Sequence, residues 1–282
     1  MEKMLFKIFL LFATTSALEL EPCHKVKIGD NWYEKQVLWS HFGRPYNLNV
    51  HKTSNTLFFS YSVPESYSDV DFQLAFYNMD SKEYQTIAGI KGGCTVAIDQ
   101  ATDDIFLGGS DGIYKYNMLT KLADYYKEKG KNVWSLFYRR NLFYISYPDQ
   151  ILHIEVDGRF AVVKEFERFE IDHFHITNDD VIYFANKTGL YKYDKKNLEV
   201  VVINELITVR QVMEDNDGEL YVCTNFGVFV DVKFEGLKKI IDIKNIFGIA
   251  FDRDNNLIYS DERSIIKLLY SVQGCPVNNS QW

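Results

Sequence analysis

A short three-part unit recurs along this chain and limits the folds that the chain can adopt. In its clearest copy, Phe247 to Tyr270, a short apolar run is followed by a polar turn, a second run, another turn and a third run. Apolar and aromatic runs of this length, separated by Asp, Asn and Gly turns, predict antiparallel strands in a meander.

The spacing of the copies predicts how the units assemble. The second runs begin at positions separated by 48, 37, 39, 39 and 37 residues, namely Leu57, Ile105, Leu142, Val181, Leu220 and Leu257. A period of about 40 residues built from three or four short strands is typical of a β-propeller, because one such sheet cannot bury both faces alone. We therefore predict an all-β, six-bladed β-propeller. The long first interval is assigned to a turn-rich insertion, Pro64 to Asp71, which is expected to be a loop.

The two ends of the chain are predicted to meet in the last blade. Counted from Tyr46, the sixth blade lacks a fourth strand, whereas Glu34 to Trp39 resembles the outer strands of the other blades. An N-terminal strand that completes the last blade closes the ring and brings Cys23 near Cys275. Four cysteines allow three pairings. This topology favours the Cys23–Cys275 disulfide, which would stabilise the closure by a few kcal/mol.

The other two cysteines, Cys94 and Cys223, fall on opposite sides of a six-bladed ring. A disulfide needs Cα atoms within about 7 Å, so these two are expected to be unpaired. No basic residue flanks either one, and we therefore favour small buried core residues over reactive thiols.

The first 17 residues, Met1 to Ala17, resemble a secretory signal peptide. Two lysines precede a short apolar run, which small residues follow. The run is shorter than the roughly 20 residues that span a membrane. Residues 18–282 are then predicted to be one secreted domain with glycosylation sequons at Asn186 and Asn278.

The charge of the chain argues against two classes of partner. Removal of Glu2, Lys3 and Lys7 with the leader changes the formal net charge from -8 to -9. An acidic chain without a basic cluster is a poor match for nucleic acid or an anionic membrane.

The inner strands of a propeller line a central channel, and small molecules usually bind at its mouth. Superposition of the six inner strands gives one ring of positions equivalent to Gly248: Asn47, Thr95, Val133, His173, Arg210 and Gly248. The preceding residues form a second ring: Tyr46, Cys94, Asn132, Asp172, Val209 and Phe247. Side chains alternate between the faces of a strand, so only one ring is expected to point inward.

These rings argue against catalysis. Six-bladed lactonases and phosphoesterases hold calcium or another divalent metal with several carboxylate and amide oxygens. Here Asp172 is the sole carboxylate in the two rings, with Asn47 and Asn132 as possible helpers. His173 and His175 share one side of a strand, as in some metal sites, but packing between blades is the favoured interpretation. No nucleophile-elbow motif is present. We expect no catalytic residues, metal or cofactor.

The remaining polar and aromatic groups suit a ligand. Arg210 and His173 would lie among aromatic and amide side chains, namely Tyr46, Asn132, Trp134 and Phe247. Aromatic rings can hold a flat aromatic molecule, while Arg pairs with its carboxylate. Any one aromatic side chain more often packs in the hydrophobic core than binds a ligand. Arg210 and His173 resist that interpretation, because unpaired charge in a core is costly.

Several hairpin sequences resemble the ommochrome-binding proteins of insect haemolymph. They are Asn55 to Tyr61, Gly112 to Tyr116, Tyr144 to Pro148 and Gly189 to Tyr193. The resemblance runs through the mature chain and implies a secreted, non-enzymatic carrier of ommochromes, which are tryptophan-derived pigments. A small aromatic pigment would be the partner, and the protein is expected to be a monomer. The resemblance carries over no residue-level site.

Two other functions stay open. A divalent-metal lactonase or esterase of the same architecture predicts bound calcium and a carboxylate cluster at the channel mouth. A protein-interaction propeller predicts a sealed channel and an exposed apolar patch on one face.

Overall fold

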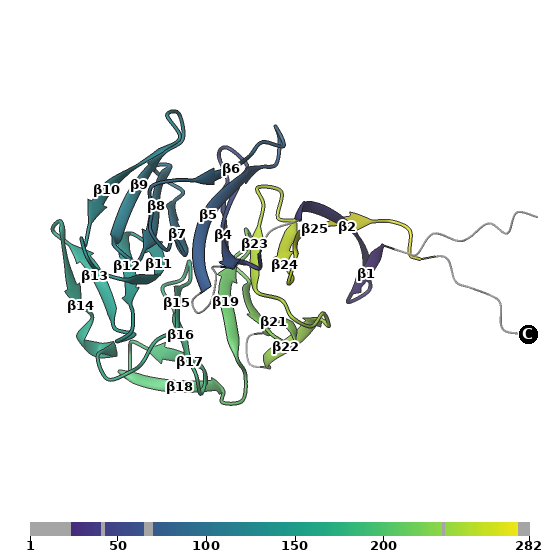
Figure 1. The fold of residues 1–282 in the computed structure, drawn as a ribbon. Helices are drawn as coiled ribbons and strands as arrows, with labels where there is room; N and C mark the ends of the chain where they lie inside the picture. Colours follow the sequence, from purple (N-terminus) through teal and green to yellow (C-terminus); the bar gives the residue numbers. More distant parts are fainter. Residues whose placement is uncertain (1–23, 41–42, 65–69, 233–234, 276–282) are drawn as a thin grey trace, which may run out of the picture.

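The computed structural model describes residues 24–40, 43–64, 70–232 and 235–275, which form six antiparallel sheets around a central axis (Figure 1). The predicted six-bladed β-propeller is confirmed. In blades 1 to 5 the four strands follow one another across the sheet in chain order, as in a meander. The innermost strands are β3, β7, β11, β15, β19 and β23.

The strands of the first three blades have these bounds. They are β3 (Pro45–His51), β4 (Thr56–Pro64), β5 (Val70–Asn78), β6 (Tyr84–Ile87), β7 (Thr95–Asp99), β8 (Asp104–Gly109), β9 (Gly112–Asn117), β10 (Leu122–Lys127), β11 (Val133–Arg139), β12 (Asn141–Ser146), β13 (Leu152–Val156) and β14 (Arg159–Val162).

The last three blades contain the remaining strands. They are β15 (His173–Ile176), β16 (Ile182–Asn186), β17 (Gly189–Asp194), β18 (Glu199–Asn204), β19 (Val209–Glu214), β20 (Leu220–Thr224), β21 (Gly227–Val232), β22 (Gly236–Ile241), β23 (Gly248–Phe251), β24 (Leu257–Ser260), β25 (Ser264–Ser271), β2 (Asn31–Ser40) and β1 (Lys25–Ile28).

The insertion in blade 1 differs from its expected form. Strands β4 and β5 remain paired out to Pro64 and Val70. The expected loop over Pro64 to Asp71 is therefore wrong at both ends, because three of its residues belong to a long hairpin and 65–69 lie outside the described residues. Apolar and polar residues alternate on both sides of the hairpin end, from Ser60 to Val63 and from Val70 to Leu74, which lets the ladder extend.

The sixth blade is built from both ends of the described chain. Strand β2 pairs with β25 from Trp32 opposite Ser271 to Ser40 opposite Ser264. Strand β1 then adds a fifth strand to the sheet. The segment Glu34 to Trp39 lies within β2, and the β1–β2 hairpin extends away from the ring (Figure 1).

The apolar core is divided into wedges between the blades. The described residues contain six buried clusters, each drawn from two neighbouring blades. Between blades 3 and 4 the wedge includes Phe166 of a short 3-10 helix, Lys164–Phe166, whose ring meets Phe174 and Phe184 edge to face. Burial of these wedges holds each sheet against the next and keeps the inner strands in a ring.

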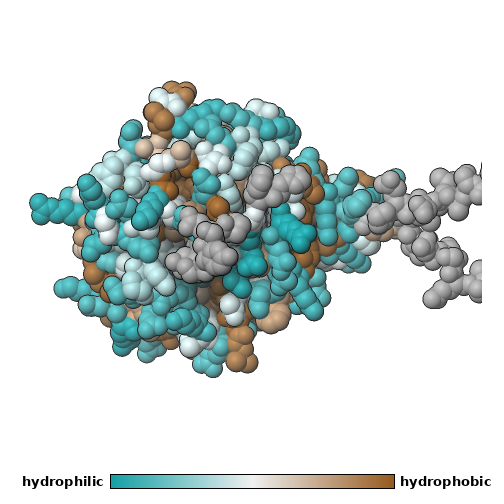
Figure 2. Space-filling view, in the orientation of Figure 1, coloured by the Kyte–Doolittle hydropathy of each residue, from teal (hydrophilic) through white to brown (hydrophobic). Residues whose placement is uncertain are grey.

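The visible surface is mainly polar. On the face shown in Figure 2 hydrophilic residues dominate, and hydrophobic residues occur in separate small groups. No helix in the described part of the chain is long and apolar enough to cross a membrane.

Candidate functional site

A cavity with a mainly apolar lining opens where the inner strands begin. It has a volume of about 350 Å³, and we call it the amino-end chamber. Its lining includes seven of the eight predicted ligand residues: Tyr46, Asn47, Trp134, Asp172, His173, Arg210 and Phe247. Asn132 is not part of this lining; its backbone oxygen accepts a hydrogen bond from the N–H of Tyr147 at 3.0 Å. The cavity is within the size range of small-molecule pockets.

Bulges in alternate blades help to bring both predicted rings to this chamber, although Asp172 and His173 both line it in blade 4, whose inner ladder has no bulge. The inner ladders of blades 1, 3 and 5 shift register between Tyr46 and Asn49, between Val133 and Ser135, and between Val209 and Gln211. The corresponding ladders of blades 2, 4 and 6 are regular. A bulge sets two residues against one partner and turns their side chains. The expectation that only one ring points inward is therefore wrong.

The bulged strands are held by side chains from other blades. Gln211 donates from Nε2 to the Leu48 oxygen at 2.8 Å, and its Oε1 accepts from the N–H groups of Leu48 and Ile249 at 3.3 and 3.1 Å. At Gly248 a Cβ atom would lie 2.7 Å from Leu48 Cδ1 and 3.0 Å from Gln211 Oε1. Glycine at this position lets the three strands approach one another.

Aromatic rings form a continuous arc along one side of the amino-end chamber. Phe247 contacts Tyr46 with ring centroids 5.5 Å apart, Tyr46 contacts Phe72 at 5.6 Å, and Phe72 contacts Trp134 at 6.2 Å. Each pair meets edge to face, the favoured geometry for neighbouring rings. Phe72 was missed at the sequence level because it lies just after the insertion of blade 1, outside the aligned inner strands.

Two guanidinium groups adjoin this arc. The Arg210 Cζ atom lies 5.2 Å from the centre of the Phe247 ring, and Arg44 Cζ lies 4.5 Å from it. Arg210 Nε is buried and has no hydrogen-bond partner among the described residues. A buried, unmatched N–H is costly, so an acceptor supplied by a ligand would be stabilising here.

His173 and Asp172, two titratable groups of the lining, differ in their electrostatics. Burial, together with the positive charge of Arg210, lowers the pKa of His173 to about 4, although a backbone hydrogen bond with Val209 opposes the shift. His173 is therefore a neutral imidazole at neutral pH. Burial raises the pKa of Asp172, against the opposing effects of Lys187 and of a hydrogen bond from Gln150. Lys187, exposed at the rim, was not predicted from the sequence.

The donor set in the chamber is a poor match for a divalent metal. Asp172 is the sole carboxylate in its described lining. The Asn47 amide donates to the Cys94 oxygen at 2.6 Å. No group of three or more His, Cys, Asp and Glu side chains in the described ranges is arranged to hold an ion. Calcium sites use six to eight oxygens, and this lining does not supply them.

The cysteines and sequons are placed as follows. Cys94 and Cys223 are free and buried, as predicted. Burial raises the pKa of Cys94 to about 12 and raises that of Cys223 as well, which disfavours reactive thiolates. Cys23, Asn278 and the leader at 1–17 lie outside the described residues, so the Cys23–Cys275 disulfide stays a prediction. Asn186 is part of the lining of the amino-end chamber.

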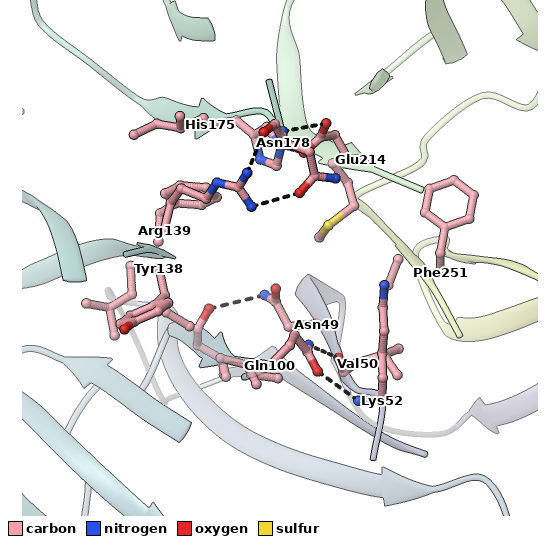
Figure 3. Close-up of a pocket in the computed structure, with 18 of the residues that line it drawn as sticks. Asn49, Val50, Lys52, Gln100, Tyr138, Arg139, His175, Asn178, Glu214 and Phe251 are labelled. Carbon is pink, nitrogen blue, oxygen red and sulfur yellow. Dashed lines mark hydrogen bonds and ion pairs between the residues drawn. The ribbon is translucent and has the colours of Figure 1, made fainter. Parts of the chain in front are cut away.

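A second cavity opens at the other end of the inner strands, and we call it the carboxyl-end chamber (Figure 3). It has a volume of about 190 Å³ and a mainly polar set of labelled side chains, among them Lys52, Arg139, His175 and Glu214. His175 Nε2 lies 3.4 Å from Glu214 Oε2, and both side chains are about nine-tenths buried. Sequence reasoning missed this chamber, because the rings were aligned only at the start of the strands.

His173 and His175 therefore line different chambers. Both touch a narrow space of about 70 Å³ between the chambers. His173 also lines the amino-end chamber and His175 the carboxyl-end chamber. The ring of His175 packs against Phe137 with centroids 5.0 Å apart, in line with the favoured packing interpretation.

Comparison with known proteins finds a similar sequence and similar folds. No protein-family profile matches the chain. The chain is 28% identical over 270 residues to the ommochrome-binding protein of Manduca sexta, covering 92% of this chain and 97% of that one. The resemblance predicted from the hairpin sequences is confirmed.

Solved structures share the fold at low sequence identity. A gluconolactonase of Xanthomonas campestris superposes with a TM-score of 0.67 at 12% identity, covering 86% of this chain and 91% of its own. A luciferin-regenerating enzyme gives a TM-score of 0.61 at 12% identity, covering 84% and 95%. At these identities the likeness concerns the propeller architecture alone.

Proposed function

Because the chain is a relative of an ommochrome-binding protein, we propose that it is a non-enzymatic binding protein for a planar aromatic pigment of the ommochrome class. The pigment occupies the amino-end chamber. The observation that carries this proposal is the arc of four rings beside the unmatched Nε of Arg210.

The chemistry of the chamber fits such a ligand. Phe247, Tyr46, Phe72 and Trp134 offer faces and edges to a flat ring system. The Arg210 guanidinium offers a donor for a carboxylate of the pigment. Neutral His173 adds no second positive charge beside Arg210, and it can donate or accept a hydrogen bond.

The proposed carrier role includes secretion of residues 18–282 after removal of the leader at 1–17. The metal-dependent lactonase is the alternative, and it shares the architecture. The lining favours binding over hydrolysis, because a metal-assisted reaction needs more oxygen ligands than Asp172 and Asn47 provide.

Tryptophan fluorescence provides a test. The stripped protein is titrated with an ommochrome such as xanthommatin, and the emission of Trp134 is expected to be quenched saturably. The Trp134→Phe variant should bind the pigment, measured by its visible absorption, while losing most of the quenching. Quenching that is unchanged in this variant would place the pigment elsewhere. Hydrolysis of a lactone that requires calcium would support the enzyme alternative.

A further inference from the structure

The carboxyl-end chamber brings together charged groups that the proposed pigment site does not use. Lys52 lies just beyond β3, Arg139 ends β11 and Glu214 ends β19, so the charged side chains come from three blades. In Figure 3 Arg139 and Glu214 lie on one side of the open space and Lys52 and Asn49 on the other.

The cationic groups keep hydrogen-bond capacity for a ligand. Lys52 Nζ donates to Asn216 Oδ1, which uses one of its three protons. Burial lowers the pKa of Lys52, opposed by the charges of Asp215 and Glu214. Arg139 donates to Asn178 from both Nη atoms at 2.7 Å, and its buried Nε has no partner in the described part of the chain.

Glu214 is the carboxylate with capacity left for a ligand cation. Its Oε1 accepts from the Asn178 N–H at 2.9 Å, and among the described residues its Oε2 has only the long contact to His175. The neighbouring Asp215 carboxylate, in contrast, has several hydrogen-bond donors around it. It accepts from the N–H groups of Asp217 and Glu219 at 2.9 Å each and from the Asn255 amide at 3.3 Å. A buried carboxylate without a full set of donors favours an added cation.

The size of the chamber limits what can enter it. A volume of about 190 Å³ is comparable to about six water molecules, at roughly 30 Å³ each. We propose that the carboxyl-end chamber binds a small zwitterion of the size of an α-amino acid, with its ammonium group at Glu214 and its carboxylate at Lys52. The binding adds no net charge to the partly buried site. This proposal does not depend on the pigment site.

Calorimetric titration of the whole mature protein with L-serine, and with two singly charged analogues, tests the proposal. L-Serinamide lacks the carboxylate and N-acetyl-L-serine lacks the ammonium group. The parent amino acid should bind one per chain, and each analogue should bind at least about tenfold more weakly, since each loses one charge-assisted bond. Glycine, alanine and threonine extend the series to smaller and larger side chains.

Variants assign the binding to this chamber. Lys52→Met and Glu214→Gln should each weaken amino-acid binding at least about tenfold. The exposed Lys196→Met and the amino-end variant Arg210→Met should leave it unchanged. Because the analogue series uses the wild-type protein, the test does not depend on the folding of any variant.

Three results would overturn the proposal. The first is the absence of heat and of any thermal stabilisation at about 10 mM of each amino acid, where a millimolar site would be mostly filled. The second is equal binding of N-acetyl-L-serine, which would indicate a simple anion site. The third is binding that survives both Lys52→Met and Glu214→Gln.

Discussion

At the scale of single residues, Arg210 and His173 are the side chains that the core does not explain. Both line the amino-end chamber, where Arg210 lies over the Phe247 ring and has a buried Nε without a partner among the described residues. In a propeller core such groups are costly unless another molecule completes their hydrogen bonds. This imbalance distinguishes the amino-end chamber from the apolar wedges between blades.

Replacement of Arg210 by methionine should weaken binding of a carboxylate-bearing pigment by about 1.5 to 3 kcal/mol, the usual scale for a charge-assisted hydrogen bond. Titration of the visible absorption band measures the change. The exposed Arg263→Met variant is the matched control and should bind as the wild type does. Wild-type affinity in the Arg210→Met protein would show that Arg210 does not bind the pigment.

The lowered pKa of His173 predicts a pH dependence of stability. The unfolded imidazole titrates near pH 6.5 and the folded one near 4, so between these values the unfolded state binds more protons. The stabilisation is fully present above about pH 6.5 and is lost as the pH falls toward 4, by up to about 3 kcal/mol. Urea unfolding at several pH values should show a shallower decline for His173→Gln than for the wild type. Parallel declines would contradict this assignment.

At the scale of strands, the bulges in blades 1, 3 and 5 shape the channel. Leu136 N–H donates to Thr95 Oγ1 at 2.9 Å, and Gln211 bonds both backbone groups of Leu48. In each case a side chain from another blade satisfies backbone groups of a bulged inner strand. Each of these bulged strands is therefore stabilised by a side chain that is far from it in the sequence.

The Gln211→Leu variant should be destabilised by at least about 2 kcal/mol. The change leaves the Leu48 and Ile249 backbone groups buried without these partners, at about 1 to 3 kcal/mol for each unmatched group. Chemical denaturation measures the effect, with the exposed Gln36→Leu as a control. Equal stability of the two variants would show that Gln211 is not needed to hold the bulge.

The sequence predicted the features of the strands that depend on neighbouring residues, and it missed those that depend on contacts between blades. Turn residues and apolar runs are local signals, so the spacing from Leu57 to Leu257 was enough to predict six blades. The bulges depend on Gln211 and Thr95, which contact them only in the fold, and the predicted rings were therefore off by a residue in places. Lys52 and Glu214 lie 162 positions apart, and no spacing rule connects them.

At the scale of the whole molecule, both ends of the chain contribute to closing the ring. The long β2–β25 ladder joins Trp32 to Ser40 with the last described strand. A Cys23–Cys275 disulfide, if formed, would reinforce this ladder by constraining the unfolded chain. The two chambers lie at opposite ends of the channel that this closure maintains.

Thiol counting tests the predicted disulfide. Of the four cysteines, Cys94 and Cys223 are free and buried. The native protein should therefore react slowly with thiol reagents, the denatured unreduced protein should expose two thiols, and the reduced protein four. Mass spectrometry after alkylation gives these numbers. Four thiols in the denatured protein without reductant would contradict the Cys23–Cys275 pairing.

We propose that the amino-end chamber holds an ommochrome without converting it. The most direct measurement is the absorption spectrum of the secreted protein purified from its natural fluid, followed by titration of the stripped protein with xanthommatin and with calcium. We predict a visible band that co-purifies with the protein and returns with pigment alone. A colourless protein that ignores the pigment, binds calcium and cleaves a lactone would contradict the proposal.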